Sequence, residues 1–413
     1  MTVDTLRLAT AGSVDDGKST LVGRLLHDSK SVLADQLEAV ERASASRGQE
    51  APDLALLTDG LRAEREQGIT IDVAHRYFAT PRRRFILADT PGHVQYTRNM
   101  VTGASTAELT VILVDARNGV VEQTRRHAAI AALLRVSHVV LAVNKMDLVG
   151  YQESVFAAIA EEFTAYATEL GVPEVTAIPV SALRGDNVVE ASARMDWYGG
   201  PTVLAHLENV PVGADPSLVP ARLPVQCVIR PRTADRPDYR GYAGRIAAGV
   251  LRVGDRVSVL PSGRTTRITG IDLLGRAVDT AWAPQSVTVL LADDIDVSRG
   301  DLIAPADAAP AVTRHIEATV CHLHERPLGP GDRVLVKHGT RTVHAVVEDL
   351  PPGTGPAGRP GRPDRLGVND IGPVVLRAFE PLPLDPYARS RATGAFLLID
   401  PADGATLAAG MAG

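Results

Sequence analysis

The stretch Leu8–Thr20, LATAGSVDDGKST, decides the fold of the first half of the chain. Small and apolar residues lead into a turn with Gly12 at one end and Gly17 at the other, and a Lys-Ser pair follows the turn. This spacing is typical of a phosphate-binding loop between a strand and a helix. In such a loop, backbone N–H groups and the positive N-terminus of the helix hold phosphate oxygens. The alternative, a strand–turn–helix without a ligand, does not require the Lys-Ser pair.

Two residues of this loop carry charge or metal chemistry. Lys18 is expected to reach the β- and γ-phosphates of a nucleotide, and the Ser19 hydroxyl is expected to bind Mg²⁺. Lys18 is therefore counted among the catalytic residues. The residues expected to touch the nucleotide in this loop are Gly12, Ser13, Val14, Asp15, Asp16, Gly17, Lys18, Ser19 and Thr20.

The composition fits a soluble globular protein of two or three domains: 413 residues, 45% hydrophobic and 22% charged. The net charge of −6 argues against a nucleic-acid-binding surface. No apolar run reaches the roughly 20 residues of a membrane span, and the first residues lack the features of a signal peptide. The two cysteines, Cys227 and Cys321, form no CxxC pattern, which favours a reducing cytoplasm.

The first half of the chain alternates apolar runs with helical segments, which predicts a mostly parallel sheet covered by helices on both faces. The expected strands are Leu6–Thr10, Arg84–Thr90, Leu109–Ala116, His138–Lys145 and Val175–Ala182, and the expected helices include Ser19–His27 and Gln123–Arg135. From about Leu223, short strands separated by turn glycines predict a small closed β-barrel and then a second one. The expected domains are 1–212, 220–308 and 312–413.

Two later motifs predict that the base is guanine. Asn144–Asp147, NKMD, follows a predicted strand, and the Asp147 carboxylate can accept hydrogen bonds from guanine N1–H and the 2-amino group together. Lys145 can lay its aliphatic stem along the base. Ser181–Leu183, SAL, follows the next predicted strand and can aim a backbone N–H at guanine O6. The cofactor-binding residues expected in these motifs are Asn144, Lys145, Asp147, Ser181, Ala182 and Leu183.

The γ-phosphate end of the site is predicted from two further segments. Asp89, in the segment ADTPGH, ends a buried strand and can hold a Mg²⁺-bound water, while the Gly92 N–H can contact the γ-phosphate. Upstream, Thr70 can offer its hydroxyl and carbonyl to Mg²⁺ and the γ-phosphate. We therefore expect the metal ligands to be Ser19, Thr70 and Asp89, and we also count Thr70 as catalytic.

The motif set GSVDDGKS, GIT, DTPGH, NKMD and SAL resembles the translation-factor class of GTPases. The resemblance implies the architecture of elongation factor Tu, a P-loop G domain followed by two β-barrels. It also implies that His93, the histidine after DTPG, orients the attacking water, although such a histidine can instead be bonded to backbone. The first P-loop aspartate, Asp15, would help to bind a monovalent cation near the phosphates.

Within that class the chain is more similar to the GTPase (large) subunit of bacterial two-subunit sulfate adenylyltransferase. The segments that carry this resemblance run through the whole chain and include SVDDGKSTLVGRLLHDSKSV, WYGGPTVLAHLE and DPYARSRATGAFLLID. It implies that GTP hydrolysis on this chain drives the formation of adenylylsulfate and pyrophosphate from ATP and sulfate on a separate small subunit. Because the sequence has no second P-loop, we expect no adenylylsulfate kinase activity from it.

Three other functions stay open from the sequence: a carrier of aminoacyl-tRNA, a GTP-bound scaffold without useful turnover, and an adenine-specific enzyme. Smaller features are interpreted as structural. The cluster of His315, Cys321, His322 and His324 is expected to be solvated strand residues rather than a zinc site. The runs Pro81–Phe85 and Thr124–His127 are expected to place their basic residues on the surface, the second as a helix face or a partner contact.

Overall fold

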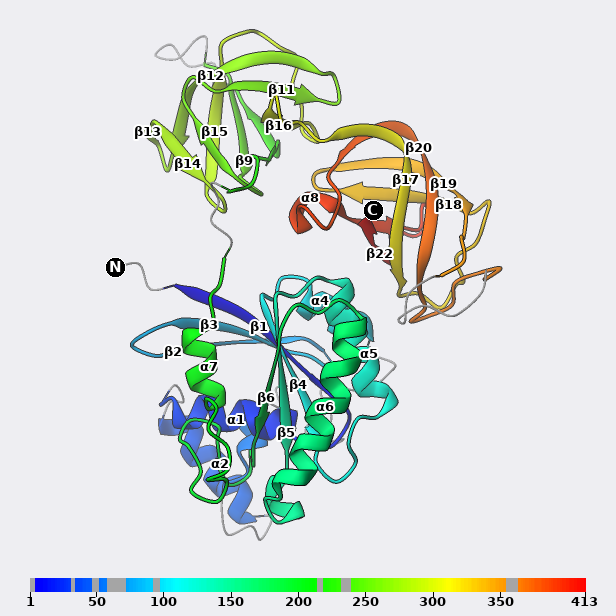
Figure 1. Ribbon diagram of the computed structural model, residues 1–413. Helices are drawn as coiled ribbons and strands as arrows, with labels where there is room; N and C mark the ends of the chain where they lie inside the picture. The colour runs from blue at the N-terminus through cyan, green and yellow to red at the C-terminus, as the bar shows by residue number, and fades with distance from the viewer. Residues whose placement is uncertain are drawn as a thin grey trace. The chain divides into compact units, whose positions relative to one another are not determined.

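A computed structural model of the chain describes residues 4–30, 34–46, 52–57, 72–91, 97–213, 218–231, 239–353 and 363–413 (Figure 1). The chain divides into two compact units, residues 1–212 and 213–413. The first unit contains the P-loop and the second is built from strands. The predicted domain limits inside the second unit stay a prediction.

The described strands of the first unit form one sheet in the order β2-β3-β1-β4-β5-β6. All neighbours are parallel except β2, which runs antiparallel to β3. The prediction of a mostly parallel sheet is therefore confirmed. The strands are β1 (Thr5–Gly12), β2 (Ala74–Ala79), β3 (Arg84–Asp89), β4 (Leu109–Asp115), β5 (His138–Asn144) and β6 (Val175–Pro179).

Helices cover both faces of this sheet. Figure 1 shows α1 and α7 on one side and α4, α5 and α6 on the other. Leu21 and Leu25 of α1 and Leu207 of α7 pack with Leu8 and Leu113 in one buried cluster. The helices are α1 (Lys18–Asp28), α2 (Ala34–Ser46), α4 (Thr97–Ala104), α5 (Glu122–Leu133), α6 (Glu153–Glu169) and α7 (Val203–Asn209), with short 3-10 turns η1 (Leu54–Leu57) and η3 (Met146–Val149).

The two basic runs are solvated only in part. Arg82 and Arg84 are exposed and Arg125 and Arg126 are half-exposed, as the sequence predicts, but other residues of the runs are buried. Arg83 is buried and donates to the carbonyls of Leu207 and Val210 at the C-terminal end of α7. The four last carbonyls of a helix have no partner within the helix, and a guanidinium supplies donors to them. Thr124 and His127, on α5, are also buried, so α5 packs the polar face of that turn inward.

The first β region of the second unit closes on itself. Its described strands pair in the order β7-β16-β11-β12-β15-β9-β8, with β13 paired to β12 and a separate pair β10-β14. Val225 N–H donates to Asp301 beside β16, and Gln226 N–H donates to Ala243 in β9. The segment from β7 to β8 is thus bonded on both sides, which closes the barrel. The strands are β7 (Leu223–Pro224), β8 (Cys227–Ile229), β9 (Gly241–Arg245), β10 (Val250–Arg252), β11 (Arg256–Leu260), β12 (Arg264–Leu273), β13 (Arg276–Val278), β14 (Thr280–Trp282), β15 (Ser286–Leu291) and β16 (Leu302–Pro305).

The second β region is a closed barrel of β17-β20-β19-β18-β21-β22 within the described residues. Its interior is filled by alternating apolar side chains, among them Val334, Val336 and Leu398. The elements are β17 (Ala311–His322), β18 (Arg333–His338), β19 (Arg341–Asp349), β20 (Ile371–Leu384), α8 (Arg391–Gly394), β21 (Ala395–Ile399) and β22 (Thr406–Ala412).

A buried ion pair joins the two barrels. Arg222, at the start of the first barrel, donates to both oxygens of Asp385, which follows β20, over 2.8 and 2.9 Å. Both side chains are 2% exposed. Thr393 Oγ1 donates to the same carboxylate over 2.6 Å. Burial alone would raise the pKa of Asp385, but the donors from Arg222 and Thr393 lower it below its usual value.

The histidine–cysteine cluster of the second barrel is solvated only in part, since His315 is exposed and His324 is half-buried. Cys321 and His322 are both fully buried. A turn covers the strand there, with His322 Nε2 lying 2.8 Å from the Arg326 carbonyl. Among the described residues, no three histidine, cysteine or acidic side chains lie together as metal ligands would. Within the same residues, no helix is both long and apolar enough to cross a membrane.

Candidate functional site

The loop between β1 and α1 wraps around the ammonium group of Lys18. Lys18 Nζ donates to the carbonyls of Gly12 and Ser13 over 2.9 and 3.0 Å. The side chain is buried, and burial lowers its pKa, while the carboxylates of Asp89, Asp16 and Asp15 work in the opposite direction. The two carbonyls thus hold a cation at the mouth of the loop, where a polyphosphate would arrive.

Asp16 fixes the turn of this loop. Its carboxylate accepts the Ser13 N–H over 2.6 Å. Burial raises the pKa of Asp16, and the Ser13 bond partly offsets that rise. Gly17 has a φ of 91° and closes the loop. A Cβ added to Gly17 would lie 2.4 Å from Asn144 Nδ2, so this position has room for glycine alone.

The carboxylate of Asp89 lies beside this loop at the end of β3. It is buried and accepts the Thr10 hydroxyl over 3.0 Å. Thr90 donates its own hydroxyl to the Thr10 carbonyl over 2.5 Å, so β1 and the end of β3 are held together. Ser19, half-buried, is the second residue of α1, directly after Lys18. Three predicted residues of the γ-phosphate end, Thr70, Gly92 and His93, lie outside the described residues.

Asn144, at the end of β5, joins three parts of the site. Its Nδ2 donates to the Asp16 carbonyl of the phosphate loop over 2.7 Å. Its Oδ1 accepts the Ala182 N–H over 2.9 Å. The sequence predicts these loops as separate motifs, whereas the structure shows that one amide side chain connects them. The Ala182 N–H is committed to Asn144, and the contact of the SAL loop with guanine O6 stays a prediction.

Lys145 has two partners within the protein that the sequence motifs do not reveal, the Asp15 carbonyl and the Asp115 carboxylate. It adopts the left-handed conformation, with a φ of 63°, and its Nζ donates to the Asp15 carbonyl. The same Nζ lies 2.9 Å from Asp115 Oδ2. Burial alone would raise the pKa of Asp115, but donors from Arg117 and Lys145 lower it far below its usual value. A carboxylate at the end of an otherwise apolar strand, LTVILVD, is the signal that would have found Asp115.

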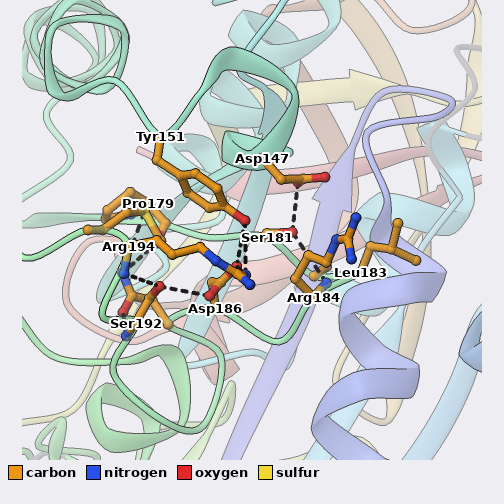
Figure 2. Close-up of polar contacts among 12 residues, drawn as sticks. Asp147, Tyr151, Pro179, Ser181, Leu183, Arg184, Asp186, Ser192 and Arg194 are labelled. Carbon is orange, nitrogen blue, oxygen red and sulfur yellow. Dashed lines mark hydrogen bonds and ion pairs between the residues drawn. The ribbon is translucent and has the colours of Figure 1, made fainter.

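Asp147 and Ser181 meet directly. The Ser181 hydroxyl donates to Asp147 Oδ1 over 2.7 Å, as Figure 2 shows. Arg24 of α1 holds the same loop from the other side, with its Nε and Nη2 donating to the carbonyls of Ala182 and Leu183 over 3.2 and 2.6 Å. Nothing local in the sequence identifies Arg24, because its partners are 158 and 159 positions away.

These residues fit a nucleotide with a bound Mg²⁺. Among the described residues, the Ser13 hydroxyl has no hydrogen-bond partner although it is buried, and it lies in the loop where phosphate oxygens would lie. The available side-chain ligands, the Ser19 hydroxyl and the Asp89 carboxylate, are oxygen donors of the kind that Mg²⁺ prefers, and phosphates and water commonly complete its shell. The arrangement can bind a purine nucleoside polyphosphate with the base beside Asp147 and the phosphates beside Lys18.

Comparisons with known proteins show the family to which the chain belongs. Residues 4–219 match the family model of the elongation factor Tu GTP binding domain, and residues 315–412 match the GTP-eEF1A C-terminal domain-like family. The chain is 57% identical over 409 residues to the bifunctional enzyme CysN/CysC of Mycobacterium tuberculosis (strain CDC 1551 / Oshkosh), covering 98% of this chain and 67% of that protein. It is 48% identical over 412 residues to sulfate adenylyltransferase subunit 1 of Bacteroides fragilis (strain YCH46), covering 99% of this chain and 86% of that protein. A crystal structure of sup35 complexed with GMPPNP matches with a TM-score of 0.45 and 23% identity, covering 100% of this chain and 94% of that chain.

Proposed function

Because the chain belongs to the sulfate adenylyltransferase subunit 1 family of translation-factor GTPases, we propose that it couples GTP hydrolysis to the synthesis of adenylylsulfate. The family makes it a GTP-hydrolysing subunit of a nucleotidyltransferase. The finer proposal is that a separate small subunit transfers the adenylyl group of ATP to sulfate, releasing pyrophosphate, while this chain supplies the driving energy.

The observation that carries the proposal is the joining of base loops and phosphate loop through Asn144. Asn144 bonds the Asp16 carbonyl on one side and the Ala182 N–H on the other. These bonds connect the loop that carries Lys18 and the loops that carry Asp147 and Ser181 into one frame. A frame of this kind recognises both ends of a single nucleotide, which the structural alternative of a plain strand–turn–helix does not require.

We assign guanine selection to Asp147 and the phosphates to the P-loop residues Gly12–Thr20. The Asp147 carboxylate would accept the N1–H and 2-amino donors that adenine does not present as a pair. Ser181 holds one of its oxygens in place over 2.7 Å. Lys145 would cover the base with its stem while its ammonium group stays on Asp115 and the Asp15 carbonyl.

We assign hydrolysis to His93, which would orient the attacking water, with Lys18 stabilising charge on the phosphates. Thr70 and Gly92 would contact the γ-phosphate. Ser19, Thr70 and Asp89 would hold Mg²⁺, and the metal, when bound, neutralises phosphate charge. A His93→Ala variant is expected to bind GDP like the parent and to hydrolyse GTP at least about a hundredfold more slowly, the lower range for loss of a general-base or water-orienting group.

The deciding experiment measures GTP turnover and adenylylsulfate formation together. The purified chain is assayed alone and then with a sulfate-adenylating small subunit, ATP and sulfate. The proposal predicts that turnover rises only in the full mixture and that adenylylsulfate appears with phosphate. If the GTP turnover rate is the same with and without the partner, ATP and sulfate, the chain hydrolyses GTP but does not couple hydrolysis to adenylylsulfate synthesis.

An Asp147→Asn variant tests whether GTP, rather than the ATP in the same mixture, drives the reaction, because it changes the residue assigned to guanine. Asparagine offers an N–H donor where guanine also has donors, whereas xanthine has a carbonyl at C2. We therefore expect XTP, and no longer GTP, to drive adenylylsulfate formation in this variant. If GTP remains as effective as in the parent, Asp147 does not select the base.

Three smaller proposals follow from the same assignment. The Asp15 side chain would help to bind a monovalent cation, so replacing K⁺ by a bulky organic cation should weaken GTP binding or slow turnover in the parent and change little in Asp15→Ala. The complex would work in the cytoplasm. The chain is expected not to phosphorylate adenylylsulfate, which a direct assay with ATP tests, although the bifunctional CysN/CysC protein is a 57% identical relative.

A further inference from the structure

The two loops that we assign to the base are joined at a second place, away from the Asp147–Ser181 bond. Tyr151, Asp186, Ser192 and Arg194 form a connected group of polar side chains, drawn in Figure 2. None of these residues belongs to the NKMD or SAL motif. The group lies where the turn that follows Asp147 meets the segment that follows the SAL loop.

Tyr151 belongs to the turn that carries Asp147. Its N–H donates to the Met146 carbonyl over 2.8 Å, which closes the turn around Asp147. Its carbonyl accepts the Trp197 indole N–H over 3.0 Å. Tyr151 has a φ of 57°, in the left-handed region that non-glycine residues rarely occupy. The backbone of this turn is therefore set by several contacts, and the Tyr151 side chain points away from it toward Asp186.

Asp186 belongs to the loop that carries Ser181. The Ser181 N–H donates to the Asp186 carbonyl over 3.2 Å, and the Gly185 N–H donates to the Ser181 carbonyl over 2.8 Å. These bonds fold residues 181–186 into one short turn with Ser181 and Asp186 side by side. Any shift of Asp186 is consequently transmitted to Ser181.

The side chains of these two residues then close the link. The Tyr151 hydroxyl donates to Asp186 Oδ2 over 2.9 Å. Ser192 Oγ donates to Asp186 Oδ1 over 2.7 Å, and Arg194 Nη1 lies 3.3 Å from Oδ2. The Asp186 side chain is 11% exposed, so its charge depends on these donors. Burial and the neighbouring carboxylate raise the pKa of Tyr151, which keeps its hydroxyl protonated as a donor.

We propose that the Tyr151–Asp186 hydrogen bond positions Asp147 against Ser181 and thereby sets how strongly the site prefers guanine to bases that lack the 2-amino group. Tyr151 and Asp186 are positioning residues, since they act through the two loops and touch no ligand atom. The inference rests on the proposed assignment of Asp147 to the base. Asp147 must meet N1–H and the 2-amino group together, and this double contact fails when the carboxylate rotates or moves.

The test compares the affinities of GDP and IDP, which differ only in the 2-amino group. Tyr151→Phe removes the hydroxyl alone and leaves Asp186 bonded to Ser192 and Arg194. We expect the ratio of GDP affinity to IDP affinity to fall about tenfold, the factor for losing one hydrogen bond to a charged group. Asp186→Ala is expected to lower the ratio at least as far. Both affinities are measured by competition against a fluorescent guanine nucleotide on the full chain.

Tyr198→Phe is the control, because it removes a tyrosine hydroxyl from the same segment. The Tyr198 hydroxyl lies within hydrogen-bond distance of the carbonyls of Ala177 and Pro201, so its partners differ from those of Tyr151. This variant is expected to keep the parent ratio.

Each result has one meaning. A lowered ratio in Tyr151→Phe with an unchanged ratio in Tyr198→Phe supports the inference. Equal weakening of GDP and IDP, an unchanged ratio, or an equal loss of ratio in the control overturns it, because the group would then be merely structural. If Asp186→Ala does not fold, Tyr151→Phe decides alone. A parent chain that does not prefer GDP to ADP would instead overturn the proposed function.

Discussion

Replacing Asp115 by asparagine is expected to weaken guanine-nucleotide binding although Asp115 belongs to none of the recognised motifs. Asp115 Oδ2 receives Lys145 Nζ at 2.9 Å and Arg117 Nη2 at 2.6 Å, and Oδ1 receives the Arg117 N–H at 2.9 Å. An asparagine has one acceptor where the carboxylate has two. In either orientation its NH₂ group faces at least one donor, and Lys145 loses its counter-charge.

The magnitude follows from burial. The Asp115 side chain is 2% exposed and Lys145 is 22% exposed, so solvent screens this pair little. A hydrogen bond to a charged group at such a site is worth about 2 kcal/mol, or roughly a 30-fold rise in the Kd for GDP. The pKa of Asp115 is lowered in the folded protein, so its contribution is complete above the unfolded value near pH 4 and is lost only at more acid pH. A titration calorimetry assay at neutral pH therefore measures the whole effect.

Arg117→Met separates the two partners of Asp115. The Arg117 side chain is 50% exposed, and removing it leaves the Lys145 contact intact. Solvent screens the exposed Arg117 guanidinium, so the Kd should rise much less than in Asp115→Asn. If Asp115→Asn binds GDP as tightly as the parent, or if Arg117→Met weakens binding as much, the reasoning about Lys145 is wrong.

Three further outcomes are expected. Gly17→Ala should abolish GDP binding in calorimetry, because the added Cβ would lie 2.4 Å from Asn144 Nδ2. Gly119→Ala is the control, since Gly119 also has a positive φ, of 67°, but an added Cβ there meets no described atom within 4 Å. This variant should bind GDP normally and lose only about 1 kcal/mol of unfolding free energy. Burial, and then the neighbouring cations Lys18 and Arg126, lower the pKa of His127 to about 3. The free energy of unfolding should therefore be highest above pH 6.5, the pKa of an unfolded histidine, and should fall as the pH drops toward 3. In urea titrations, His127→Leu should reduce the slope of this fall by up to about 1.4 kcal/mol per pH unit. Arg222→Met should lower the free energy of unfolding of the 213–413 unit by about 3–5 kcal/mol, because it leaves the Asp385 carboxylate buried without its partner; a loss under about 1 kcal/mol contradicts this.

The parts of the site that the sequence predicts are those fixed by local rules. Asp89, Asn144 and Ser181 each stand at or just beyond the carboxyl end of a parallel strand, and such ends meet at one edge of a sheet. Lys18 follows a glycine turn at the start of a helix. Because strand ends and helix starts are visible in the residue pattern, the candidate site could be assembled from the sequence.

The missed residues are those whose partners are distant in sequence. Arg24 bonds carbonyls near position 182, and Arg83 bonds carbonyls near position 207. An arginine in a charged run has the same local pattern whether it faces water or caps a helix. The Cys321–His322 pair is a second case. Strand alternation predicts that one of these two neighbours is exposed, but a turn covers the strand and buries both. Only the tertiary contacts decide these cases.

The described loops of the site indicate which residues can respond to the difference between bound GTP and bound GDP. The base loops are bonded to each other through Asp147–Ser181 and to the phosphate loop through Asn144. GTP and GDP share the base, the ribose and two phosphates, so these bonded loops meet the same groups in both ligands. A ligand shifts a conformation only by binding its two states differently. The difference must therefore come from residues at the γ-phosphate, and our assignments place Thr70, Gly92 and His93 there.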